Sequence, residues 1–108
     1  MTAHAYIRAV RQLYQHLPHT CGRFSRSDRL LAADFFRRQI PFETLRCAML
    51  LTVARRLYRN GPPLPVIRSL QYFAPALDEI LRQPLPPGYV QYLEYKLAHV
   101  QMGGGSNR

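Results

Sequence analysis

The sequence has little negative charge, no tryptophan and almost no lysine. Only six of its 108 residues are Asp or Glu, and Lys96 is the one lysine beside 14 arginines. No serine or cysteine lies in a recognisable nucleophile signature, and there is no glycine-rich phosphate loop. Because the chain offers so few acid, base and nucleophilic groups, we expect that it is not an enzyme.

Long apolar runs are also missing. No stretch approaches the roughly 18 residues that a membrane-spanning helix needs, and the first residues, with Arg8 and Arg11 among them, contain no signal-peptide core. The two cysteines, Cys21 and Cys47, lie in settings too different to predict a disulfide. We therefore expect an intracellular, cytoplasmic protein with reduced thiols.

A histidine and cysteine cluster is the only candidate metal site. His16, His19 and Cys21 lie within six residues, but no second segment supplies a matching ligand pair. Tetrahedral zinc sites usually combine pairs from two segments. We expect no bound metal and no other cofactor.

Positive charge is abundant and one-sided. The formal net charge is +9. Residues 1–68 hold twelve arginines against three acidic residues, whereas residues 69–108 hold three basic and three acidic residues. Arginine pairs bidentately with phosphate and with guanine, so the first hypothesis is a polyanionic partner. A GC-rich genome also favours arginine codons, and the uneven distribution therefore carries more weight than the composition.

Apolar residues recur at helical spacing, and prolines separate the periodic segments. The pattern predicts an all-α fold, a compact bundle of about five short helices joined by proline-rich loops. Residues 1–102 form a single domain in this interpretation, and the glycine-rich tail, 103–108, is flexible. The expected helices are Thr2 to Leu17, Arg26 to Arg38, Pro41 or Phe42 to about Arg59, Ser69 to about Leu81, and Tyr89 to Gln101.

Local signals set several helix ends. Ser25 and Asp28 have the spacing of a helix start, and Asn60-Gly61 is typical of a left-handed stop. The helix that begins near Pro41 is the most apolar and should be the central element. Pro75 falls inside the fourth pattern, so that helix either kinks there or begins after Ser69.

The arginines fall into clusters that we expect to contact phosphate. Thr52 and three arginines share one face of the third helix, and Asp34 precedes two others at ion-pairing distance along the second. Any single arginine can instead be a solvated or ion-paired side chain. The leading contacts are Arg55, Arg56 and Arg59, followed by Arg37 and Arg38, then Arg8, Arg11 and Arg26, with Arg23 and Arg29 in the same region.

The second and third helices, joined by Gln39-Ile40-Pro41, have the outline of a DNA-reading helix pair. A simple structural hairpin is favoured, because the middle of the third helix is too apolar to lie in a major groove.

Tyrosines mark the last helix. Tyr89, Tyr92 and Tyr95 flank its apolar stripe. Such rings can stack on bases, but they lie in the neutral part of the chain, where a protein contact or self-association is favoured.

The segment from Ile40 to Leu81 partly resembles the C-terminal helical domain of DnaD-like replication proteins. The similarity is carried by IPFETLRCAMLLTVARRLYRNG and by the later SLQYF. Tyr72 matches the family's tyrosine, while Ala76 and Ile80 stand where the family has isoleucine and tryptophan, and Pro75 interrupts the helix. The resemblance implies a helical fold and a primosome or DNA-replication context.

Together these patterns predict a small basic nucleic-acid-binding protein, with DNA more expected than RNA, in a replication or mobile-element context. Arginines of the first three helices would hold the phosphate backbone. The alternative is a protein-interaction adaptor or subunit with a basic surface for an acidic partner and a tyrosine-flanked last helix for oligomerisation.

Overall fold

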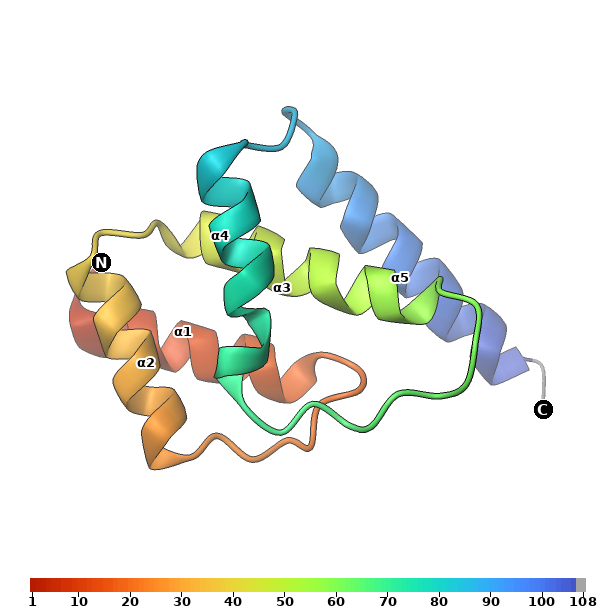
Figure 1. The fold of residues 1–108 in the computed structure, drawn as a ribbon, viewed down its shortest axis with the longest axis horizontal. Helices are drawn as coiled ribbons and strands as arrows, with labels where there is room; N and C mark the ends of the chain where they lie inside the picture. The colour runs from red at the N-terminus through yellow and green to blue at the C-terminus, as the bar shows by residue number, and fades with distance from the viewer. Residues whose placement is uncertain (107–108) are drawn as a thin grey trace.

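Helices make up the fold in the computed structural model, which describes residues 1–106. The predicted all-α class is confirmed, and no β-strand occurs in this range. The elements are α1 (Ala3–His16), α2 (Arg26–Arg37), α3 (Phe42–Leu57), the 3-10 turn η1 (Leu70–Phe73), α4 (Ala74–Arg82) and α5 (Tyr89–Ser106) (Figure 1).

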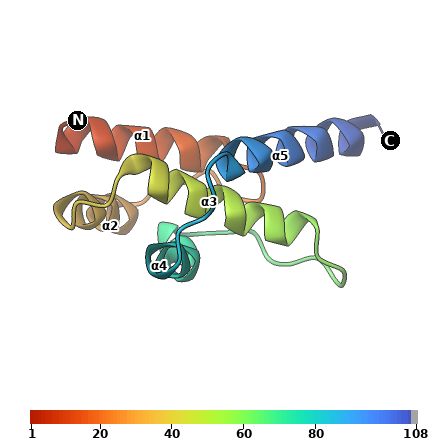
Figure 2. The same ribbon diagram turned by 90° about the horizontal axis from the view of Figure 1, so that it is seen from above.

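Helix α3 runs through the middle of the molecule and contacts α1, α4, α5 and η1. Viewed from above, α1 and α5 lie on one side of α3 and α4 lies on the other (Figure 2). Nine of the 16 residues of α3 are buried. Its predicted central position is therefore confirmed.

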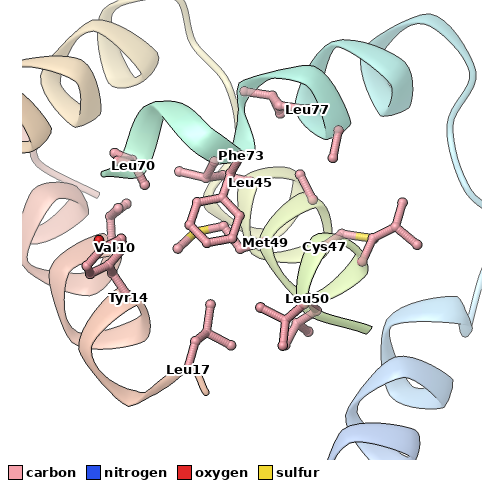
Figure 3. Packing of buried hydrophobic residues seen from close by; sticks show 14 of the residues in the cluster. Val10, Tyr14, Leu17, Leu45, Cys47, Met49, Leu50, Leu70, Phe73 and Leu77 are labelled. Atoms are coloured by element: carbon pink, nitrogen blue, oxygen red, sulfur yellow. The ribbon is translucent and has the colours of Figure 1, made fainter. Parts of the chain in front are cut away.

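The core is formed where α1, α3 and η1 meet. Tyr14, Leu45, Met49 and Phe73 are fully buried and gather there (Figure 3). The rings of Tyr14 and Phe73 lie edge to face, with centroids 6.2 Å apart. The Tyr14 hydroxyl donates to the carbonyl of Ile67 at 3.3 Å, so the core also fixes the loop before η1.

A capping box begins α2 at the helix start that the sequence predicted. The Asp28 amide donates to Ser25 Oγ at 3.1 Å, and the Ser25 amide donates to Asp28 Oδ2 at 2.9 Å. The other carboxylate oxygen of Asp28 accepts from the Leu70 amide at 2.9 Å. This carboxylate is only 2% exposed and joins the start of α2 to η1.

The structure corrects the predicted end of the third helix and decides between the two expected starts of the fourth. The predicted stop of the third helix at Asn60-Gly61 is wrong, because α3 ends at Leu57. Tyr58 turns toward α5, where its hydroxyl donates to the Lys96 carbonyl at 3.2 Å. The fourth helix has the later of its two expected starts, and Pro75 lies in the first turn of α4. Proline is tolerated there, because an amide in the first turn would have no hydrogen-bond partner within the helix.

The last helix is longer than predicted. Helix α5 extends to Ser106 rather than ending at Gln101. The tail predicted to be flexible, 103–108, overlaps this last turn, and residues 107 and 108 lie outside the described residues. Its flexibility stays a prediction.

Gln39 ends α2 in a left-handed conformation, with φ of 62°. Its amide donates to the Phe36 carbonyl and the Ile40 amide to the Phe35 carbonyl, at 2.9 and 3.1 Å, which is the hydrogen-bond pattern of a Schellman cap. A side chain is disfavoured at this φ, so Gln39→Gly is expected to raise the free energy of unfolding by about 0.5–1 kcal/mol. Urea denaturation measures the change.

Gln12→Gly is the matched control, because Gln12 is exposed in the interior of α1. There the same substitution is expected to lower stability by about 1 kcal/mol. Two changes of equal sign would contradict the role assigned to the φ of Gln39.

Candidate anion-binding site

The predicted arginine contacts do not share one surface. Arg37 and Arg38 lie at the end of α2, next to the start of α3, whereas Arg55, Arg56 and Arg59 lie at the far end of α3. The 16 residues of α3 span about 24 Å. The two clusters that ranked first in the sequence are therefore separated by the length of the central helix.

Carboxylates neutralise several of these arginines. Arg55 Nη1 lies 2.8 Å from a carboxylate oxygen of Glu79. Asp34 pairs with both Arg37 and Arg38, as the i,i+3 and i,i+4 spacing allowed. These side chains are poor candidates for phosphate contacts, because an anion would compete with a carboxylate already in place.

Arg56 is buried, with 8% of its surface exposed. Its guanidinium donates to the Tyr72 hydroxyl at 2.8 Å, to the Pro65 carbonyl at 2.5 Å and to His19 Nδ1 at 3.4 Å. The predicted surface position of this charge is wrong, because three neutral acceptors hold the guanidinium inside. Of the leading three arginines, Arg59 is the exposed one without a carboxylate partner among the described residues, and it donates to the Pro62 carbonyl.

A small cleft lies between α1 and α2. It has a volume of about 290 Å³, and its lining residues are His4, Ile7, Arg8, Arg11, Phe24 and Arg29. Helix α1 buries Tyr6, Val10 and Tyr14. These three residues define the inner face of α1. Arg8 and Arg11, three residues apart, lie beside that face and line the cleft. We call this site the α1–α2 cleft.

The charge in the α1–α2 cleft is uncompensated. Within the part of the chain that the structure describes, Arg8, Arg11 and Arg29 form no ion pair with a carboxylate. The nearest acid in the sequence, Asp28, is buried and occupied by two backbone amides. Arg8 contacts His4 Nε2 at 3.2 Å. The cleft therefore presents three guanidinium groups with donors available to an anion.

Two further arginines lie near this cleft. Arg26 is one turn before Arg29 on α2, and Arg23 lies in the preceding loop; both are exposed. Neither has a carboxylate partner in the described structure. Arg29 was outside the leading set of predicted contacts. The Ser25 and Asp28 capping signal, which fixes the helical phase of Arg29, could have raised its rank.

The tyrosines of α5 lie where the sequence placed them, beside its apolar stripe. Tyr92 and Tyr95 are 51% and 64% exposed, and Tyr89 is half-buried. The Lys96 ammonium lies 4.6 Å from the Tyr58 ring centroid and 5.9 Å from that of Tyr92. Their role as an interface stays a prediction.

The histidine and cysteine cluster does not form a metal site in the described residues, where no three His, Cys, Asp or Glu side chains are suitably grouped. Cys21 and Cys47 are free thiols. Partial burial and the nearby Arg56 guanidinium both lower the pKa of His19.

No helix within residues 1–106 is both long and apolar enough to cross a bilayer. Comparison of the chain with family models, with curated proteins and with solved structures found no match. In the structure, the Leu70–Phe73 part of SLQYF is a 3-10 turn. The resemblance to DnaD-like domains stays a prediction.

Proposed function

We propose that the protein binds nucleic acid and that a backbone phosphate enters the α1–α2 cleft. One observation carries the proposal: Arg8, Arg11 and Arg29 line a common cleft and have no acidic partner in the described structure. Charge-assisted bonds from guanidinium to phosphate are short, strong and often bidentate. DNA is the expected form, in the replication or mobile-element context that the partial resemblance suggests.

The lining of the cleft favours a phosphate over a base or a whole groove, because three of its six residues are arginines. At about 290 Å³ it is at the lower end of ligand-sized sites. Arg23 and Arg26 beside it can hold neighbouring phosphates of the same strand. Phosphate contacts depend on the backbone rather than on the bases, so we expect weak sequence preference. We also expect binding without catalysis.

A protein-interaction function is the second candidate. The exposed Tyr92 and Tyr95 rings on α5 favour it, because tyrosine is enriched in protein interfaces. In this proposal α5 contacts a partner or a second copy. It is compatible with nucleic-acid binding at the other end of the molecule.

A salt series with unrelated DNA and RNA oligomers tests the proposed function. If three to five phosphates are neutralised, the plot of log affinity against log salt has a slope of about −3 to −4.5 for duplex DNA. Oligomers of equal length and different sequence should bind alike. The proposal is wrong if no binding occurs at about 50 mM salt, where the electrostatic contribution is strongest.

A further inference from the structure

A second hollow surface lies at the C-terminal end of α3. It consists of two adjoining hollows of about 320 and 580 Å³, which share Arg56, Arg59 and Leu64. The first continues to Val66, and the second to Tyr72 and Pro75 at the start of α4. We call this surface the α3-end groove. It is separate from the α1–α2 cleft, with which it shares no lining residue.

One wall of the α3-end groove is apolar and open to solvent. Leu64, Val66 and Tyr72 are 40%, 38% and 44% exposed. Large apolar side chains gathered at one hollow commonly mark a binding site, because leaving their surface in contact with water is unfavourable and a ligand can cover it. The groove therefore has room and surface for an apolar side chain.

Its charge is positive. Arg56 is buried there without a carboxylate partner in the described residues, and its acceptors, the Tyr72 hydroxyl, the Pro65 carbonyl and His19 Nδ1, are all neutral. Arg59 is exposed next to it. At the rim, Arg55 is already paired with Glu79. The groove thus combines an apolar wall with two guanidinium groups that have no counter-ion.

Backbone hydrogen bonds hold one side of the groove in place. The loop before η1 is tied to the loop after α1, because the Ile67 amide donates to the His19 carbonyl at 2.7 Å and the Cys21 amide donates to the Ile67 carbonyl at 2.8 Å. Gly61, with φ of 131°, lies under the Arg59 guanidinium, where a Cβ would be 3.1 Å from Nη2. A site held in this way loses little conformational entropy when a ligand binds.

We propose that the α3-end groove binds a short acidic segment of a partner protein, with a large apolar side chain of that segment between Leu64, Tyr72 and Pro75. Carboxylates of the segment pair with the exposed Arg59, and the buried charge of Arg56, which lines both hollows, adds to the attraction. The aliphatic side chains of Leu64, Val66 and Pro75 suit an apolar side chain better than a base. One face of the Tyr72 ring is already covered, because the Arg56 guanidinium lies 5.3 Å from its centroid. The proposal does not rest on nucleic-acid binding.

Selection of displayed random peptides against the full chain tests this inference. We expect the selected sequences to be rich in Asp and Glu around one large apolar residue. A synthetic peptide of the selected consensus should shift the amide signals of Arg59, Leu64 and Gln71 in a ¹⁵N spectrum. Replacing its acidic residues with amides, or its apolar residue with glycine, should weaken binding about tenfold, equivalent to about 1.4 kcal/mol.

Gln71→Glu adds a negative charge to the groove, and we expect it to weaken the consensus peptide about tenfold. Gln91→Glu, at another exposed position, on α5, is the control and should bind as the unmodified chain does. The inference is overturned by consensus peptides without acidic enrichment, by a selection that yields no groove binder, or by shifts that map to the α1–α2 cleft. A DNA oligomer that competes with the peptide at the groove would also overturn it.

Discussion

Replacing Arg8, Arg11 and Arg29 together with glutamine is expected to lower DNA affinity about 100- to 1000-fold at roughly 0.1 M salt. With each phosphate contact that is lost, fewer counterions are released from the DNA on binding. The plot of log affinity against log salt should therefore become less steep by about 0.9 per contact. Glutamine keeps a polar side chain at all three exposed positions. Equilibrium binding to one duplex oligomer across a salt series measures both effects.

The control removes the same formal charge from arginines that already have carboxylate partners. Arg37, Arg38 and Arg55 pair with Asp34 or Glu79. Their joint replacement with glutamine should therefore reduce affinity far less, and should leave most of the salt slope intact. Equal losses in the two triple variants would show that net charge alone governs binding and that the cleft has no special role.

Asp28→Ala is expected to lower the free energy of unfolding by about 3 kcal/mol, a large share of the stability of a small domain. The loss of the contact with the Ser25 amide removes part of a helix cap, at about 1 kcal/mol. The Leu70 amide, whose hydrogen bond is buried, would lose its acceptor, at about 1–3 kcal/mol. Urea denaturation measures the sum.

Ser25→Ala separates the two contributions. It removes the side-chain cap but leaves the carboxylate on the Leu70 amide, so we expect a loss of about 1 kcal/mol. If Asp28→Ala were no more destabilising than Ser25→Ala, the link between α2 and η1 would contribute nothing. Retained helical circular dichroism in both variants is the check that the bundle still forms.

The sequence predicted what local chemistry determines. The start of α2 follows from Ser25, whose side chain accepts a hydrogen bond from the amide three residues later. The start of α1 was predicted to within one residue from the apolar periodicity. The central position of α3 follows from its nearly continuous apolar surface. These features depend on residues close together in the chain, so periodicity and capping signals are sufficient to find them.

The choice of candidate site depended on contacts between residues far apart in the sequence, which local patterns do not reveal. Arg56 was ranked with Arg55 and Arg59 because the three share a helix face, yet its guanidinium contacts His19, 37 residues away along the chain. Arg55 meets Glu79 of α4 in the same way. The packing of whole helices neutralises Arg55 and buries Arg56. It therefore moved the candidate site from the end of α3 to the α1–α2 cleft.

The arginine side-chain Nε–H signals of the ¹⁵N-labelled protein, followed during titration with a duplex DNA oligomer, test the proposed phosphate site most directly. We expect the signals of Arg8, Arg11 and Arg29 to shift together and to saturate, while that of the buried Arg56 stays in place. Shifts concentrated on Arg59, or no change in the three cleft signals at low salt, would contradict the assignment of the phosphate site to the α1–α2 cleft.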